Sequence, residues 1–167
     1  MGAKSQRLNG RRCLGDVSMS RTHGYMVTWT TYGTWLQGDG RGYVQNGKIL
    51  GGNKGLEQAN KERRRGDKVK LKKAEREVAR RAILAEAERI GEKILALSVW
   101  SNHVHVVIRE GGKPIGKVVS RLKSAAYYAL RERGIDGRMW TRGYDNRFCF
   151  DERALKDRVT YVMRHKG

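Results

Sequence analysis

The feature that most constrains the fold is a pair of apolar runs with only two residues between them. Residues 93–100 read KILALSVW, and residues 103–109 read HVHVVIR. Both runs are rich in residues that favour β-strands, and so short a connection is typical of a tight antiparallel hairpin. The chain is therefore expected to contain an antiparallel sheet that includes this hairpin.

Two histidines share one face of the second strand. Side chains alternate between the two faces of a strand, so His103 and His105 project together, away from the aliphatic face. The aliphatic positions are Val104, Val106 and Ile108. The strand rise places the two histidine Cβ atoms roughly 6.5–7 Å apart, a span that two imidazoles can close around one metal ion. The pattern predicts a metal or catalytic site, while two ordinary polar positions on a half-exposed strand stay open as the alternative.

The charge of the chain indicates a polyanionic partner. Lys and Arg number 36 against 17 Asp and Glu, so the 167 residues carry a formal net charge of +19, and nucleic acid is the expected partner. A membrane surface is the rival partner. However, no apolar run approaches the roughly 20 residues that span a bilayer, and the N-terminus lacks the apolar core of a signal peptide. We expect a cytoplasmic, nucleoid-associated protein without membrane contact.

The two cysteines do not form a metal-binding motif. They are Cys13 and Cys149, which are too far apart in the sequence for a CxxC pair. Any metal is therefore expected to bind through histidine and oxygen ligands.

The remaining patterns predict a single α+β domain. Residues 1–22 are basic and lack a hydrophobic period, which is typical of a disordered tail, and residues 23–167 hold the domain with a glycine-rich loop at 32–55. Strands are expected at 25–31, 93–100, 103–109 and within 139–150, and helices at about 71–90, 114–133 and 151–165. The order β-α-β-β-α-β is that of the ferredoxin-like fold, a four-stranded antiparallel sheet with two helices on one face. An additional C-terminal helix follows.

Helical periodicity identifies the buried faces of the last two helices. The helix at 114–133 is expected to bury Val118, Leu122, Ala125 and Ala129, and the last helix Leu155, Val159 and Val162. Tyr161 and His165 are four residues apart and therefore share one flank of the last helix. A tyrosine in such a place is most often a packing residue with its hydroxyl in water. Together with the histidine pair and the cationic surface, it is also a candidate nucleophile.

Four segments together resemble the single-tyrosine HUH transposases, the small enzymes of single-strand insertion sequences, and their relatives the REP-associated tyrosine transposases. HUH denotes His-hydrophobic-His, which here is His103-Val104-His105. The matching segments are YMVTWTTYG, SNHVHVVI, MWTRGY and VTYVMRH, and they occur in the family's order over most of residues 23–167. The histidine motif alone is short, whereas the four segments together are specific.

The resemblance implies a metal-dependent transposase that cleaves and rejoins single-stranded DNA. Tyr161, on the additional C-terminal helix, would be the nucleophile and form a 5′-phosphotyrosine, while His103 and His105 would hold Mg²⁺ or Mn²⁺. His165 occupies the place where some members carry a Gln as a third metal ligand. Hairpin-containing element ends are the implied substrate. Family members include dimers and monomers, so the oligomeric state stays open, as do the recognised hairpin and whether the chain still moves an element.

Further residues are candidates for DNA contacts. Lys117, Arg121 and Lys123 are expected to follow the phosphate backbone, with Arg142 as a further cation and Trp35 as a stacking platform for an unpaired base.

Tyr127 and Tyr128 compete with Tyr161 as nucleophiles. Helical geometry places Tyr127 opposite the predicted buried stripe and Tyr128 on a flank, and the resemblance places the nucleophile in the last helix. Both arguments favour Tyr161.

Two other functions remain alternatives. A ferredoxin-like sheet with a positive face can bind single-stranded DNA or RNA without catalysis, although no RRM-like aromatic pattern is present on a strand. A metal-dependent nuclease that uses water would not need Tyr161. A covalent protein–DNA adduct is expected only for the transposase.

Overall fold

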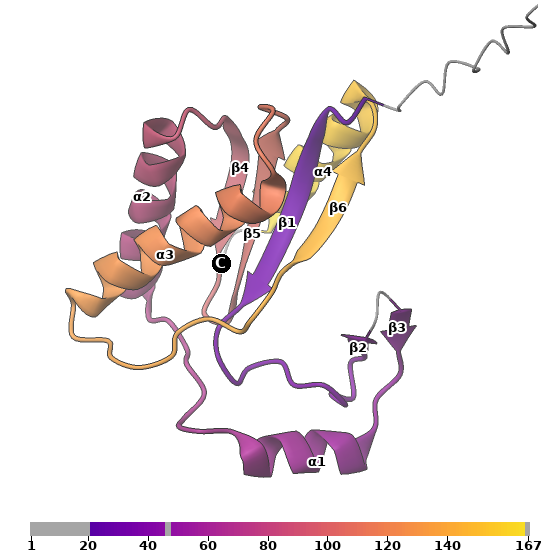
Figure 1. Ribbon diagram of the computed structural model, residues 1–167, viewed down its shortest axis with the longest axis vertical. Coiled ribbons are helices and arrows are strands. Elements are labelled where there is room, and N and C mark those ends of the chain that lie inside the picture. The colour runs from indigo at the N-terminus through magenta and orange to yellow at the C-terminus, as the bar shows by residue number, and fades with distance from the viewer. Residues whose placement is uncertain (1–20, 46–47, 166–167) are drawn as a thin grey trace, which may run out of the picture.

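The computed structural model describes residues 21–45 and 48–165. Four strands form one antiparallel sheet in the order β4-β5-β1-β6. The strands are β1 (Gly24–Thr30), β4 (Ile94–Val99), β5 (His103–Arg109) and β6 (Asp145–Cys149). Figure 1 shows α2 (Lys73–Arg89) and α3 (Ile115–Arg131) on one face of the sheet and α4 (Glu152–Arg164) on the other. This confirms the predicted ferredoxin-like arrangement with an additional C-terminal helix.

Each face of the sheet carries an apolar core. The larger core joins the sheet to α2 and α3 and includes Val27, Trp29, Val104, Val106, Ile108, Ile83 and Leu122. The smaller core joins it to α4 and consists of Met26, Ala96, Val107, Cys149, Leu155 and Val162. Because Val104, Val106 and Ile108 all belong to the larger core, His103 and His105 point to the face that α4 covers, as the alternation of the strand predicts.

Helix α4 is fixed to the sheet at both of its ends. Its N-cap is Asp151, whose carboxylate accepts a hydrogen bond from the backbone N–H of Ala154 (2.7 Å). Leu155 and Val162 are buried against the sheet. At the other end, Ser98 Oγ on β4 donates to the backbone carbonyl of His165. These contacts fix which residues of the helix lie over the histidine strand.

We expect Leu155→Ala to lower the free energy of unfolding by about 2–5 kcal/mol, because it removes a fully buried side chain between α4 and the sheet. Met163→Ala on the same helix is the control, since Met163 is half exposed and should change stability little. Thermal and urea unfolding measure both. Equal stability of the two variants would contradict the docking of α4 described here.

The buried face of α3 differs from the prediction. Val118 and Leu122 are buried as expected, but Ala125 and Ala129 are only half buried. The other buried residues are Val119, Ala126 and Leu130. The helix is thus rotated by about one position toward α2 and the sheet, which buries the larger Leu130 instead of Ala129.

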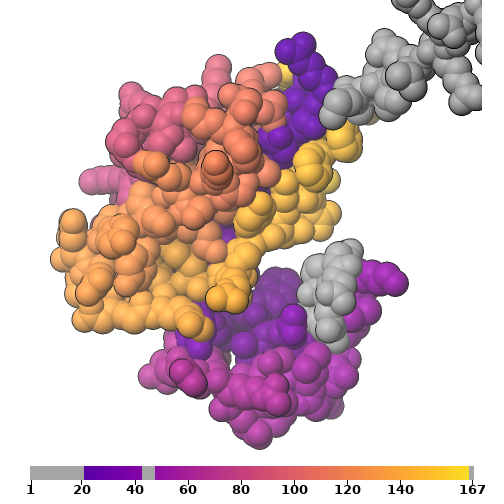
Figure 2. Space-filling view, viewed as in Figure 1, coloured from indigo at the N-terminus to yellow at the C-terminus, as the bar shows by residue number. Residues whose placement is uncertain are grey.

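Residues 32–70, called the insertion here, are more ordered than the glycine-rich loop predicted at 32–55. They contain the short hairpin of β2 (Tyr43–Gln45) and β3 (Lys48–Leu50), followed by helix α1 (Lys54–Arg63). Helix α1 was not predicted, because it buries no residue and therefore has no apolar period. In the space-filling view the insertion forms a separate lobe below the sheet (Figure 2).

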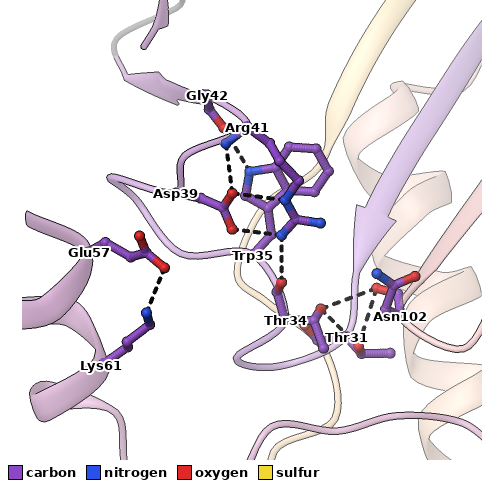
Figure 3. A network of polar contacts seen from close by, with 9 residues as sticks. All are labelled: Thr31, Thr34, Trp35, Asp39, Arg41, Gly42, Glu57, Lys61 and Asn102. Atoms are coloured by element: carbon purple, nitrogen blue, oxygen red, sulfur yellow. Dashed lines mark hydrogen bonds and ion pairs between the residues drawn. The ribbon is translucent and has the colours of Figure 1, made fainter. Parts of the chain in front are cut away.

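A polar network ties the insertion to the sheet (Figure 3). Arg41 binds both carboxylate oxygens of Asp39, at 2.8 and 2.6 Å, and this pairing lowers the pKa of Asp39 to about 2. The fully buried Thr31 donates its hydroxyl to the carbonyl of Val69 (2.7 Å) and its backbone N–H to the carbonyl of Asn102 (2.9 Å). The base of the insertion therefore contacts the β4–β5 turn that precedes His103.

Most of the predicted basic tail, residues 1–20, lies outside the residues that the structure describes. None of the helices in the described part of the chain is long and apolar enough to cross a membrane.

Candidate active site

The face of the sheet under α4 changes from apolar to polar along its strands. Near one end it carries the apolar side chains that contact Leu155 and Val162. Toward the other end, Ser98, His105, Thr28 and Asp145 follow one another across β4, β5, β1 and β6 in paired positions. Four polar side chains on neighbouring strands thus form a row, and His103 lies two residues further along β5.

The C-terminal turn of α4 brings Tyr161 and His165 to this row. The Tyr161 ring centroid lies 6.0 Å from that of His105 and 4.2 Å from that of His165. The His103 and His105 rings are 4.6 Å apart. The structure therefore brings together all four residues that the sequence singled out for chemistry, although they come from two elements that are about 55 residues apart in the chain.

Hydrogen bonds orient both strand histidines. His103 Nδ1 lies 2.7 Å from Asn102 Oδ1, which can only accept, so His103 donates through Nδ1 and keeps a lone pair on Nε2. His105 Nδ1 lies 2.7 Å from Thr28 Oγ1. In the tautomer with a proton on Nδ1, the Nε2 atom of His105 also carries a lone pair. Partners of this kind are typical of histidines that bind metal.

Burial keeps both strand histidines neutral. It lowers the pKa of His105 to about 4, with further lowering by the neighbouring His103 and His165. Burial and the nearby His165 also lower the pKa of His103. Neutral imidazoles are the form in which histidine binds metal ions or accepts protons.

The aromatic side chain of Trp100 forms one wall of the site. Its ring stacks on His103 at 5.5 Å with an angle of 10° between the planes, and lies 6.5 Å from His165. A large flat neighbour restricts how far the His103 ring can turn and shields it from water.

Two of the three predicted metal ligands, His103 and His105, lie close together. Within residues 21–45 and 48–165, no group of three or more His, Cys, Asp or Glu side chains is placed to hold a metal ion. The reason is the position of His165, whose ring tilts over Tyr161 and whose Nδ1 lies 3.0 Å from the Tyr161 carbonyl. The donor atoms of His103 and His105 suit a metal, whereas His165 would have to move to join them.

A cavity of about 390 Å³ opens beside the tyrosine. It is lined by Asp157, Thr160, Tyr161, Arg164 and His165. Tyr161 is 42% exposed, so its ring can be reached from solvent. An exposed phenol next to the neutral imidazole of His105 and the guanidinium of Arg164 is an arrangement that can receive a phosphate and attack it.

Several residues of the site were missed in the sequence. Thr28 and Asn102 hold the histidines, Trp100 stacks on one of them, and Ser98 fixes the end of α4. Thr28 had a signal, because alternation along residues 24–30 puts it on the polar face. Asn102 directly precedes His103 in the sequence, whereas the contact of Ser98 depends on the docking of α4, which has no local signal.

The three predicted cations of α3 have different surroundings. Arg121 forms an ion pair with Glu86 of α2 at 2.7 Å. Lys123 is half buried and donates to the carbonyls of Thr141 (2.8 Å) and Gly143 (2.9 Å). Lys117 is exposed. All three lie across the sheet from Tyr161, so their predicted phosphate contacts would belong to DNA on that side.

The other two predicted DNA contacts lie outside α3. Arg142 is exposed in the segment between Trp140 and β6. Trp35 belongs to the insertion, where its Nε1 donates to the carbonyl of Gly42 (2.9 Å) and Arg41 lies 4.5 Å from its ring. Its ring is 41% exposed, so one side remains open for stacking.

The two competing tyrosines belong to α3 and lie on the opposite face of the sheet from His103 and His105. Tyr127 packs beside the larger core, contrary to the prediction that it points away from the buried stripe, because α3 is rotated as described above. Tyr128 is exposed on the same helix. Neither shares a face with His103 and His105, whereas Tyr161 does.

Comparison with solved structures shows which fold this is. A REP-associated tyrosine transposase bound to a REP hairpin gives a TM-score of 0.50 at 12% sequence identity, and the match covers 97% of this chain and 70% of that one. A Deinococcus radiodurans R1 protein, provisionally assigned as a transposase, gives 0.44 at 13% identity, with 98% and 99% covered. No protein-family model matches the chain, and no curated protein does. The chain thus has the fold of a tyrosine transposase.

Proposed function

We propose that this protein cleaves and rejoins single-stranded DNA with Tyr161 as the nucleophile and a divalent metal ion as cofactor. The observation that carries the proposal is the closeness of the Tyr161 ring to two imidazoles, 6.0 Å from that of His105 and 4.2 Å from that of His165. The shared fold and the net charge of +19 support a DNA substrate.

The chemistry is covalent catalysis by a phenol. Tyr161 Oη attacks a backbone phosphorus and the P–O3′ bond breaks, which leaves a 5′-phosphate joined to Tyr161 and a free 3′-OH on the other strand end. A second 3′-OH can attack the phosphotyrosine and restore a phosphodiester. Because the linkage conserves the energy of the broken bond, rejoining needs no nucleotide cofactor.

His103 and His105 would hold Mg²⁺ or Mn²⁺ through Nε2, and His165 is the candidate third ligand. Water and phosphate oxygens of the DNA would complete the coordination shell, which suits these hard cations. When bound, the ion would polarise the scissile phosphate and offset its developing charge. Asn102 and Thr28 orient the two imidazoles, and Trp100 covers one of them.

Hairpin-containing element ends are the proposed substrate. The transposase with the shared fold is bound to a REP hairpin. If this chain also recognises a hairpin, a hairpin with a single-stranded flank should bind at least about tenfold more tightly than an unstructured strand of equal length. Competition titrations at physiological salt measure the ratio. Equal affinity for hairpin, random strand and duplex would favour a nonspecific binder.

We expect Thr28→Val to weaken metal binding at the site without unfolding the protein. The change keeps the side-chain volume but removes the Nδ1 partner of His105, and losses of such partners typically cost 10–100-fold in metal affinity or activity. The Mn²⁺ concentration for half-maximal cleavage should rise by about that factor. Thr28→Ser retains the hydroxyl and should behave as the wild type. An unchanged Mn²⁺ requirement in Thr28→Val would show that the contact has no role in metal binding.

The test of the proposal is incubation of the full chain with labelled single strands that contain the hairpins flanking its own gene, with and without Mn²⁺. On a denaturing gel, a labelled band at the size of the protein is expected only with metal. Cleavage without such a band would indicate a nuclease that uses water. Binding without cleavage would indicate a non-catalytic DNA- or RNA-binding protein.

A further inference from the structure

An aromatic-walled cavity of about 400 Å³ lies across the sheet from Tyr161 and has no part in the reaction proposed above. Helix α3 supplies Ser120, Ser124, Tyr127 and Tyr128 to its wall, and the segment before β6 supplies Trp140 and Tyr144. The two tyrosines of α3, which lie on the other face of the sheet from the histidines, are therefore part of the wall of this cavity.

Small residues on the outer face of α3 create the hollow. Gly116, Ser120 and Ser124 are spaced by four residues and so lie in line along one side of the helix. Tyr144 lies over the first of them, since a Cβ atom on Gly116 would be 3.1 Å from the Tyr144 hydroxyl. A larger side chain at Gly116 would displace that ring.

The wall opposite α3 is held in place by hydrogen bonds to Lys123 of that helix. Lys123 donates to the carbonyls of Thr141 and Gly143, and burial lowers the pKa of its ammonium group. The Trp140 indole donates to the carbonyl of Lys123 (3.0 Å), and its ring meets Trp29 edge-on at 6.2 Å. These contacts preform the cavity, so little ordering is needed when a ligand enters.

The lining chemistry suits a nucleobase. Tyr128 and Tyr144 are 61% and 40% exposed, so each has a ring face free to stack. The hydroxyls of Ser120 and Ser124 can pair with the polar edge of a base. None of the described residues that line the cavity carries a carboxylate, and Arg142 is exposed in the adjoining loop, so the phosphates of a strand would not be repelled.

We propose that this cavity binds one unpaired base of the DNA strand that Tyr161 cleaves. The inference rests on the proposed function and deepens it. The loop that forms the cavity abuts the end of the sheet that carries the histidines: Thr30, paired with His103, donates to Thr141 Oγ1 (3.0 Å). A single strand can therefore pass around this end of the sheet from one site to the other.

The test compares two probes of equal length, an oligothymidylate and a strand of abasic residues, which share phosphates and differ in bases. Wild-type chain should bind the oligothymidylate more tightly. Tyr128→Ala and Tyr144→Ala should each weaken that binding about tenfold, the typical effect of losing one stacking partner, and leave binding of the abasic strand unchanged. Tyr144→Phe keeps the ring and should bind as the wild type. Phe150→Ala is the matched control, because Phe150 is an equally exposed aromatic residue outside the cavity.

The outcomes separate this inference from the proposed function. Unchanged oligothymidylate binding in both alanine variants, or an equal loss for the abasic strand, would overturn the base site, even if the wild type forms its covalent adduct. Selective loss of oligothymidylate binding without any adduct in the wild type would support the base site and contradict the covalent chemistry. Absence of single-strand binding by the wild type would overturn both.

Discussion

Tyr161→Phe is expected to abolish the covalent protein–DNA adduct while leaving single-strand binding almost unchanged. The substitution removes only the oxygen that attacks phosphorus, and the competing tyrosines, Tyr127 and Tyr128, lie on the other face of the sheet. The ring packing against His105 and His165 is preserved. Denaturing gels of metal-supplied reactions measure the adduct, and fluorescence anisotropy measures binding.

Two controls make this result specific. Tyr127→Phe and Tyr128→Phe lie on α3, on the other side of the sheet, and should form as much adduct as the wild type. Adduct formation that survives Tyr161→Phe and disappears in one of these variants would move the nucleophile to α3 and contradict the site described here.

His105→Ala is expected to reduce metal-dependent cleavage by roughly 100-fold or more, and His103→Ala by a similar factor, because each loses a donor atom next to the scissile phosphate. Stability should change little, since both side chains project from the face that α4 only partly covers. His23→Ala is the matched control: this histidine pairs with Glu152 near the opposite end of the sheet. Cleavage that persists in EDTA, or unfolding of either variant, would show that the histidine pair is structural.

The strands and most helices could be predicted because their signals are local. Alternation along β5 requires only that one face be buried, so the sequence alone assigns both histidines to the face opposite the aliphatic side chains. Asp151 likewise marks the start of α4 through its own side chain.

The insertion could not be predicted because polar contacts hold it together. Helix α1 buries no side chain, so its sequence has no apolar period; instead Asn53 caps it and the pair of Arg41 and Asp39 orders the preceding loop. Contacts of this kind join residues whose spacing follows no repeat.

The candidate site was predictable in its reactive residues but not in their support. Tyr161 and His165 are linked by helical spacing, and His103 and His105 by strand spacing. Thr28 reaches His105 only through the register of β1 against β5, and Ser98 reaches the end of α4 only through the packing of the helix on the sheet. Both depend on contacts between distant parts of the chain.

The central claim, that Tyr161 becomes joined to DNA, is tested most directly by mapping the adduct in the wild-type chain. After reaction with single-stranded DNA and Mn²⁺, nuclease and trypsin digestion would leave a short nucleotide on one peptide. Trypsin cuts after Arg158 and Arg164, so Tyr161 is the only tyrosine of the peptide VTYVMR. Mass spectrometry should find the nucleotide there. Its presence on SAAYYALR, which carries Tyr127 and Tyr128, or the absence of any modified peptide despite cleavage of the DNA, would contradict the account.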